Sequence, residues 1–245
     1  HRDLHLSIRR QRQMCIRDSI REARRLKAKK TIVEQDIASV DNPSARAKLS
    51  DDTVGIGLYP IDIHGHQDVP GAGQAAKPFQ IPLAAMVQTR LRNFLPACKN
   101  IGTTHVTNGA YRLHPIEWAI GEAAGEVAAF SVLKRTTPAS IQANRIKLRN
   151  IQHKLIADGA PIFWFDDVPT THQCFAAVQF VAALGLMPGK SDELHFRPDE
   201  VMDALEAEVI VAKVKESAPS GTTSRAEFAQ WLYSCLLYTS DAADE

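Results

Sequence analysis

The segment that most constrains the fold is a long run of small side chains that begins at Pro115. Proline is favoured at the first position of a helix, because its missing N–H would have no partner there. If His114 is the cap, Glu117 occupies the third helical position, where a carboxylate can reach back to the amide of the cap. The pattern therefore predicts a helix from about Pro115 to Lys134.

The small side chains of this predicted helix recur at spacings of three and four residues, at Gly121, Gly125, Ala128 and Val132. Such a stripe would let the helix lie very close to a neighbouring sheet. The start of a helix also offers free N–H groups and a positive dipole end, which suit an anion or an electron-rich carbonyl. Polar residues just before the helix would line such a site: His105, Asn108, Tyr111, Arg112 and His114. The alternative is an ordinary buried helix with a polar cap.

Composition excludes several classes of function. The chain is 44% hydrophobic with a formal net charge of +1, so there is no overall basic field to bind nucleic acid. The longest apolar run, Cys174 to Met187, is interrupted by Gln179 and is too short to span a bilayer. The four cysteines are scattered without a C-x-x-C pair, which argues against a zinc ribbon or a disulfide framework.

Both ends of the chain have unusual sequences. QMCIRDS near the start and SCLLYTSDAADE at the end resemble translated sequencing-adapter read-through. Residues 1–18 and 234–245 are therefore expected to be artefacts and are set aside from the fold prediction. The remaining chain is expected to be a fragment of a longer protein.

Periodicity predicts several further elements. A short basic helix is expected at 19–30, strand at 54–63, a loop at 67–79, and a buried strand with a turn at 93–102. A second long helix is expected from 136 to Gly159, which would end it. A separate helical unit is expected from residue 161 to 233.

Residues 101–129, IGTTHVTNGAYRLHPIEWAIGEAAGEVAA, resemble the C-terminal flavin-binding segment of FAD-dependent oxidoreductases with a glutathione-reductase-like fold. Those proteins carry a similar Ile-x-x-Thr-His, Arg-x-x-Pro and Gly-x-Ala-Ala-Gly run. The likeness covers roughly residues 20–160 and implies an α/β fold. It implies part of a substrate or cap domain at 19–77 and the C-terminal part of the FAD-binding domain at 78–160.

The resemblance implies FAD as the cofactor and places its flavin ring at the helix start. The residues it assigns to the cofactor are Arg112, Leu113, His114, Pro115, Ile116 and Gly121. Arg112 would stabilise negative charge near the flavin N1/C2 carbonyl. The G-x-G-x-x-G turn that seats the ADP half is absent and would lie upstream of residue 1. GAGQAA at 71–76 does not replace it, because it follows no strand and Pro78 would stop a helix.

Asp62, His64 and His66 form a D-x-H-x-H pattern. Alternate residues of a strand share a face, so the two histidines could hold a divalent ion, but no third ligand is apparent and no metal is predicted. The other interpretations are ordinary histidines or a substrate pocket. His64 and Tyr111 are the candidates for contact with substrate, with His64 as a proton donor or acceptor.

Residues 161–233 resemble an S-layer homology repeat, with Asp166 and Asp167 ahead of a helix that ends at Gly185, and Ser224-Arg225-Ala226-Glu227-Phe228 later. A single such unit is expected to act as a packing appendage, and contact with a cell-wall polymer stays open.

The sequence thus predicts a truncated FAD-dependent oxidoreductase that transfers a hydride between a small organic substrate and flavin. The alternative is a non-catalytic envelope or wall-binding protein on a degenerate flavoprotein scaffold. The sequence leaves open a cytoplasmic or envelope location and the oligomeric state.

Overall fold

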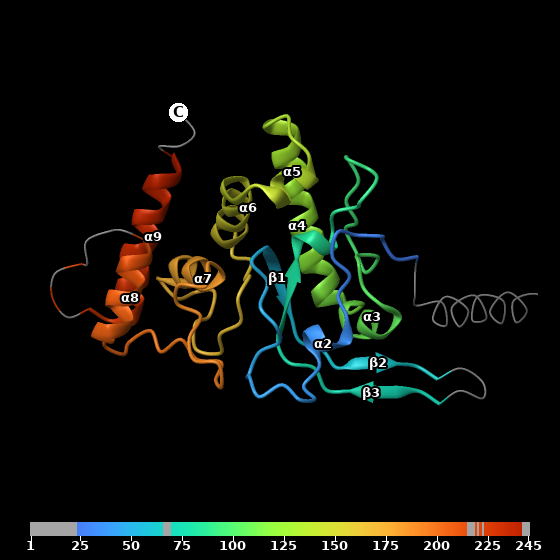
Figure 1. The fold of residues 1–245 in the computed structure, drawn as a ribbon, viewed down its shortest axis with the longest axis horizontal. Helices are drawn as coiled ribbons and strands as arrows, with labels where there is room; N and C mark the ends of the chain where they lie inside the picture. The colour runs from blue at the N-terminus through green and yellow to red at the C-terminus, as the bar shows by residue number, and fades with distance from the viewer. Residues whose placement is uncertain (1–23, 66–69, 215–218, 220, 222, 242–245) are drawn as a thin grey trace, which may run out of the picture.

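The computed structural model describes residues 24–65, 70–214, 219, 221 and 223–241 (Figure 1). It contains two small antiparallel sheets in the first half and a group of helices in the second (Figure 1). In one sheet, β1 (Thr53–Gly57) pairs with β4 (Phe79–Pro82). In the other, β2 (Ile61–Ile63) pairs with β3 (Ala72–Gln74).

The predicted long helix is confirmed as α4 (His114–Leu133), which begins one residue earlier than expected. Its buried face is formed by Ile116, Ile120, Ala123, Ala124 and Val127. These are ordinary apolar side chains at helical spacing, and this face packs on β1 (Figure 1). The burial of this face, rather than intrinsic propensity, is what fixes a helix of this length.

The predicted close packing of the small-residue stripe is wrong. Val132 is 78% exposed, and a side chain added at Gly125 would meet no atom within 4 Å. The close approach is made instead by glycines of the strand. A Cβ added at Gly57 would lie 2.9 Å from Ile116 Cγ1, and one at Gly55 would lie 3.4 Å from Ala119 Cβ. The helix therefore approaches the sheet through bare backbone on β1, whereas Gly125 and Val132 of the predicted stripe face outward.

The second predicted helix is divided in two, α5 (Pro138–Ala143) and α6 (Arg145–Ala157). Asn144 lies between them in an extended conformation, and its side-chain oxygen accepts hydrogen bonds from the N–H groups of Ile146 and Lys147, both at 3.0 Å. An N-cap of this kind competes with continued helix and starts a new one. The predicted end at Gly159 is confirmed by its φ of +85°.

Three local predictions fail. Residues 24–30 contain no helix, and Ala28 forms an isolated bridge to Gln88, while 19–23 lie outside the described residues. Residues 93–102 form turns rather than a buried strand, and Phe94 is exposed. The expected loop at 67–79 contains β3, which pairs with β2 as a hairpin. The short elements α2 (Glu34–Ile37), α3 (His105–Tyr111) and η1 (Leu83–Ala85) complete this half.

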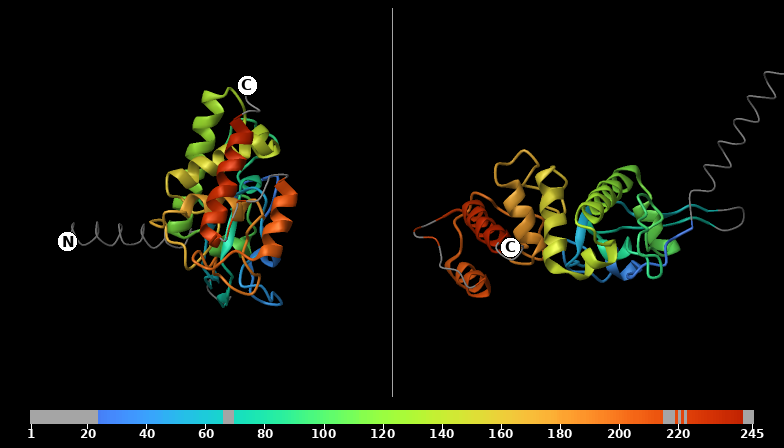
Figure 2. Two further views of the ribbon diagram at one scale, coloured as in Figure 1. Left: turned by 90° about the vertical axis from the view of Figure 1, so that its left-hand side faces the viewer. Right: turned by 90° about the horizontal axis from the view of Figure 1, so that it is seen from above.

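The second half of the chain contains the helices α7 (Phe175–Ala183), α8 (Ala204–Val214) and α9 (Arg225–Asp241) (Figure 2), and the division into a separate unit at 161–233 stays a prediction. Helices α7 and α9 pack together, and α6 packs on α7. Asp167 organises the turn before α8, because its carboxylate accepts the N–H groups of Phe196 and Arg197 at 2.8 and 2.7 Å. Arg225 lies over the Phe196 ring, 5.2 Å from its centroid, and pairs with Glu206.

One cluster of buried side chains runs from the β1–β4 sheet through α6 to α7 and α9. The two halves of the chain therefore share a core. The expected α/β mixture of helices and small sheets is confirmed. The sheets formed by the described residues are two-stranded and antiparallel, so the glutathione-reductase-like fold stays a prediction.

Candidate functional site

The helix α3 carries the first of the predicted site residues and lies directly against β2. Thr104 caps it by accepting the N–H of Thr107 at 3.1 Å. A Cβ added at Gly109 would lie 2.6 Å from the Asp62 carbonyl oxygen. Glycine at this position is therefore required for the close contact of α3 with β2, and this contact sets the position of Arg112 at the end of the helix.

Asp62 joins Arg112 and His64 into one polar group. Arg112 Nη2 donates to the Asp62 carbonyl oxygen at 2.9 Å and lies 3.8 Å from its carboxylate Oδ2. His64 Nε2 lies 3.2 Å from the same Oδ2. Arg112 is mostly buried whereas His64 is exposed, so the group reaches from the protein interior to the solvent at one end of the β2–β3 hairpin. A cation, a carboxylate and an imidazole in this order can bind an anionic substrate group and move a proton.

Tyr111, predicted to contact substrate, lies in the core with 1% of its surface exposed. Its hydroxyl donates to the Gln80 carbonyl oxygen at 2.9 Å, and its ring stacks on Phe79 with the centroids 4.4 Å apart. Burial, together with the charge of Asp36, raises the pKa of Tyr111 well above its ordinary value. The hydroxyl is thus held neutral and hydrogen-bonded inside the protein.

A pocket of about 590 Å³ lies at the start of α4. It brings together two predicted cofactor residues, His114 and Gly121, with side chains from the same face of α4 and from the preceding loop: Ala97, Cys98, Glu117, Trp118 and Glu122. Trp118 is 72% exposed, and its indole N–H donates to Glu122 Oε1 at 2.7 Å. The pocket thus combines a flat aromatic side chain with carboxylates.

Glu117 has an unusual environment in this pocket. Its Oε1 is buried and accepts no hydrogen bond from any described residue, and the nearest cation, Lys99 Nζ, is 3.8 Å away. Burial raises the pKa of the Cys98 thiol, and the neighbouring Glu117 carboxylate raises it further. A buried carboxylate oxygen without a donor is costly, so a ligand that donates a hydrogen bond would be favoured here.

The first turn of α4 has fewer free donors than the sequence suggested. The N–H groups of Ile116 and Glu117 donate to the Leu113 carbonyl oxygen at 2.9 and 2.8 Å, and Pro115 has no N–H. The N–H of His114 is the first-turn donor that remains without a partner among the described residues. The helix start can therefore contribute its dipole and one N–H to a ligand.

The structure separates the predicted site residues into two groups. His114 and Gly121 line the α4 pocket, whereas Arg112 and His64 meet at Asp62. The remaining cofactor residues lie between them: Leu113 is half-buried as the cap of α4, Pro115 is exposed and Ile116 is buried against β1. Sequence reasoning missed Trp118 as a pocket residue. Its spacing of four from His114 and three from Gly121 is the signal that places it on their face.

The D-x-H-x-H pattern is only partly within the described residues, because His66 lies outside them. Elsewhere in the described chain, no three His, Cys, Asp or Glu side chains gather as metal ligands would. No helix within the described ranges is long and apolar enough to cross a bilayer. The GAGQAA segment contains β3 where a phosphate-binding turn would require a helix.

Comparison with known families gives two matches in sequence order. Residues 17–155 match the FAD dependent oxidoreductase family, and residues 165–208 match the S-layer homology domain. Neither a curated protein nor a solved structure shows significant similarity to the chain. The S-layer homology domain points to an association with the cell envelope. Because the first match covers more than half of the sequence and includes α3, α4 and both residue groups, the chain belongs to the FAD dependent oxidoreductase family and carries an S-layer homology domain after its oxidoreductase segment.

Proposed function

We propose that this chain supplies the flavin-ring side of the FAD site in an enzyme that transfers a hydride between a small organic substrate and flavin. The observation that carries the proposal is the α4 pocket within the segment matched to the family. When bound, FAD supplies the two-electron acceptor of the reaction.

The residues of the α4 pocket fit a flavin ring. A flavin has a flat apolar body and an edge that bears both carbonyl and N–H groups. Trp118 and Gly121 provide an apolar wall, Glu117 Oε1 offers a buried acceptor that receives no hydrogen bond from a described residue, and the His114 N–H offers a donor. Leu113, Pro115 and Ile116 hold these groups at the helix start.

Arg112 lies two residues ahead of His114 and outside the pocket lining, and it is proposed to hold positive charge on the side of the ring where reduction adds negative charge. Its hydrogen bond to the Asp62 carbonyl fixes the guanidinium in place. We propose His64 as the residue that exchanges a proton with substrate, since it is exposed and lies beside the Asp62 carboxylate. Tyr111, with its hydroxyl bound to Gln80, is proposed to act on substrate only through the position of α3.

The outward stripe of α4 supports a further part of the proposal. Gly125 and Val132 lie uncovered by any described residue, and small side chains on a helix suit close packing against another element. We propose that a further segment of a longer enzyme with a glutathione-reductase-like fold covers this face and binds the ADP half of FAD. This chain alone would then bind FAD no more tightly than it binds riboflavin.

The test is a fluorescence titration of the purified chain with riboflavin and with FAD. We expect similar dissociation constants for the two, within about threefold, because the ADP half finds no partner. Gly121→Leu, which fills the pocket, should abolish binding of both. Gly125→Leu is the matched control, because it adds the same side chain one turn along the same helix and outside the pocket.

Two results would contradict the proposal. If neither flavin binds, or if the two leucine variants bind equally well, the pocket does not hold the flavin ring. If FAD binds more than tenfold tighter than riboflavin, the chain contains its own site for the ADP half, and the truncated arrangement is wrong.

The S-layer homology domain is proposed to bring the enzyme to a cell-wall polymer. Because this domain shares a core with the oxidoreductase segment, the two are proposed to bind to the cell wall together, as one folded unit. Sedimentation of the intact chain with purified cell walls tests it, and a chain that stays in the supernatant at low salt would refute it.

A further inference from the structure

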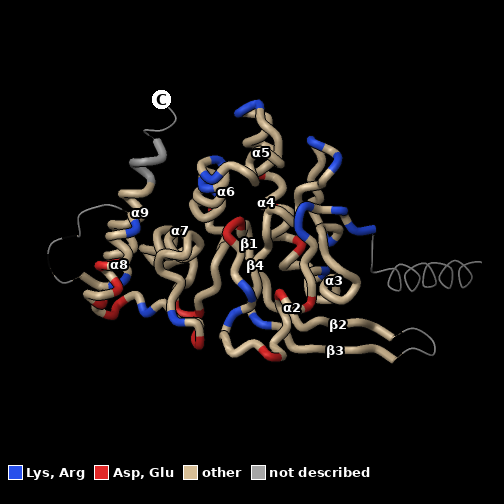
Figure 3. Tube along the Cα trace, viewed as in Figure 1, with Lys and Arg blue, Asp and Glu red and all other residues tan. Residues whose placement is uncertain are grey.

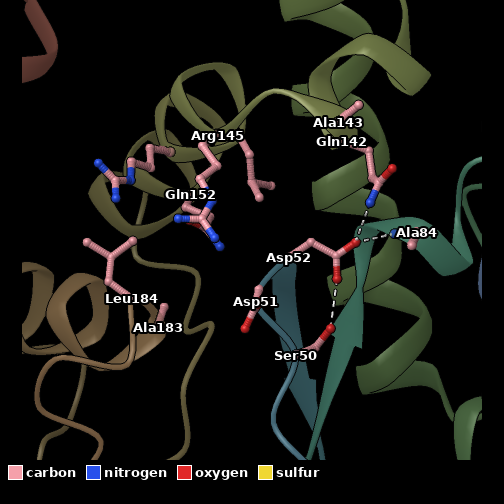
Figure 4. Close-up of a pocket in the computed structure, with 12 residues that line it drawn as sticks. Ser50, Asp51, Asp52, Ala84, Gln142, Ala143, Arg145, Gln152, Ala183 and Leu184 are labelled. Atoms are coloured by element: carbon pink, nitrogen blue, oxygen red, sulfur yellow. Dashed lines mark hydrogen bonds between the residues drawn. The ribbon is translucent and has the colours of Figure 1, made fainter.

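A second cleft, of about 580 Å³, lies between α6 and the end of α7 (Figure 4). Its walls come from four places in the sequence: residues 50–52 ahead of β1, Ala84 of η1, the α5–α6 junction with one face of α6, and Ala183 and Leu184 at the end of α7. Figure 4 shows Arg145 and Gln152 on the α6 wall, with Asp51 and Asp52 across from them. The cleft therefore lies where the oxidoreductase segment meets the S-layer homology domain.

Two arginines on successive turns of α6, Arg145 and Arg149, line this cleft. Neither forms an ion pair or a hydrogen bond with any described residue. Helix α6 carries no Asp or Glu, and Figure 3 shows only basic positions along it. Burial lowers the pKa of Arg149, and the charge of Arg145 lowers it further. Like charges four residues apart destabilise a helix, so this pair lacks the counter-charge that would make it favourable.

The carboxylates on the opposite wall do not supply that counter-charge. Asp52 is buried, and its carboxylate is occupied by hydrogen bonds within the protein. It accepts hydrogen bonds from the Ser50 hydroxyl and the Ala84 N–H, both at 2.7 Å, and from Gln142 Nε2 at 3.3 Å. Asp51 is exposed at the cleft and forms no hydrogen bond with a described residue. The cleft thus has a cationic wall and, facing it, an acceptor that suits a hydroxyl donor.

We propose that this cleft binds a small hydroxylated organic anion, a sugar acid or a polyol phosphate. Its carboxylate or phosphate contacts Arg145 and Arg149, and its hydroxyl groups donate to Asp51. Guanidinium groups match both kinds of anion with paired N–H donors, and the volume suits a small molecule rather than a polymer. The proposal does not rest on flavin binding, because the cleft shares no lining residue with the α4 pocket.

The test is calorimetric titration of the intact chain at low salt with glycerol 3-phosphate and, separately, with glucuronate. These two probes distinguish the phosphate form of the ligand from the carboxylate form. We expect at least one of them to bind. Arg145→Gln and Arg149→Gln should each weaken that binding about tenfold, the usual effect of removing one charged hydrogen-bond donor. Arg149→Lys, which keeps the charge without the paired donors, should fall between wild type and Arg149→Gln.

Arg92→Gln is the matched control, because Arg92 is exposed and does not line the cleft. It removes one positive charge and should change affinity less than twofold. Failure of both probes to bind, or an equal loss in Arg92→Gln, overturns the proposal. Circular dichroism of each variant checks that the variant is folded. If both α6 glutamine variants are unfolded, the decisive variant is Arg149→Lys, and wild-type affinity in Arg149→Lys would overturn the proposal.

Asp51→Asn tests the hydroxyl contact separately. Wild type should bind glycerol 3-phosphate more tightly than inorganic phosphate, whereas Asp51→Asn should bind the two about equally, since its carboxylate acceptor is gone. An unchanged preference in Asp51→Asn would refute the part of the proposal that assigns hydroxyl recognition to this residue.

Discussion

Replacement of Arg46 should weaken the junction between the oxidoreductase segment and the S-layer homology domain. Arg46 is only 5% exposed. Its Nε and Nη2 both donate to the Trp164 carbonyl oxygen, at 3.1 and 3.0 Å, and its Nη1 donates to the carbonyl oxygens of Glu193 and Lys190, at 2.7 and 3.3 Å. The guanidinium carbon lies 5.1 Å from the centroid of the Phe163 ring.

The structure sets the size of this effect. Each hydrogen bond from a charged donor contributes about 1.5–3 kcal/mol, and a cation–π contact contributes about 0.5–2 kcal/mol. The sum of these contributions is an upper limit, because water can enter the site once the side chain is truncated. The cost of burying the charge also reduces the sum: burial lowers the pKa of Arg46, although the charges of Asp166, Asp167 and Glu193 raise it. We expect Arg46→Ala to lower the free energy of unfolding by about 3–5 kcal/mol. Arg46→Lys keeps the charge but loses the fork, and should cost about 1–2 kcal/mol.

Urea unfolding followed by far-ultraviolet circular dichroism measures both variants, with Arg92→Ala as the exposed control, expected within about 0.5 kcal/mol of wild type. Limited proteolysis should show faster cleavage around residues 158–165 in Arg46→Ala than in the control. The reasoning is refuted if Arg46→Ala unfolds at the wild-type urea concentration, or if Arg46→Lys is as unstable as Arg46→Ala, since the fork geometry would then contribute nothing.

Three further changes test other contacts. Gly109→Ala should destabilise the chain by about 1–3 kcal/mol in urea unfolding, because the added Cβ would lie 2.6 Å from the Asp62 carbonyl oxygen; a neutral effect would mean that α3 moves freely on β2. Folding raises the pKa of Tyr111, so above about pH 10 its hydroxyl ionises in the unfolded chain before it ionises in the folded protein. The free energy of unfolding of wild type should therefore fall as pH rises above about 10, by up to about 1.4 kcal/mol per pH unit. Tyr111→Phe should lack this loss between pH 8 and 11, and an identical loss would assign it elsewhere. Cys98 should react with iodoacetamide more slowly than an unperturbed thiol at pH 8, and faster in Glu117→Gln, as followed by mass spectrometry of its peptide; no acceleration would exclude Glu117 as a cause.

Local signals predicted the start of α4 to within one residue, because Pro115 marks a helix start through its own chemistry. The predicted cap was wrong, since Leu113 rather than His114 is the N-cap and no side chain caps the helix. The same signals could not say which face of that helix is buried. A stripe of small residues and a stripe of apolar residues run side by side on α4, and the glycines of β1 decide between them. The break at Asn144 also could not be predicted from the pattern of apolar residues. An asparagine inside such a pattern interrupts a helix only when its side chain caps a following helix, as Asn144 caps α6.

The candidate site shows the same division. The polar residues around Arg112 could be found from their order in the chain, whereas their separation into two groups depends on Asp62, which is 50 residues away from Arg112 in sequence. Arg145 and Arg149 look like a solvated helix face in the sequence, and only the fold places residues 50–52 opposite them. Contacts over such separations carry no periodic signal, so pattern analysis misses them.

The contacts of Arg46 also bear on how this two-part chain can diverge. Arg46 binds its partner segment through the main-chain oxygens at Trp164, Lys190 and Glu193, and any residue type provides such an oxygen. Side-chain changes at those three positions would leave the bonds in place, whereas nearly any change at Arg46 removes them. Tolerance of these hydrogen bonds to mutation should therefore be one-sided, with residues 164, 190 and 193 freer to vary than Arg46 itself.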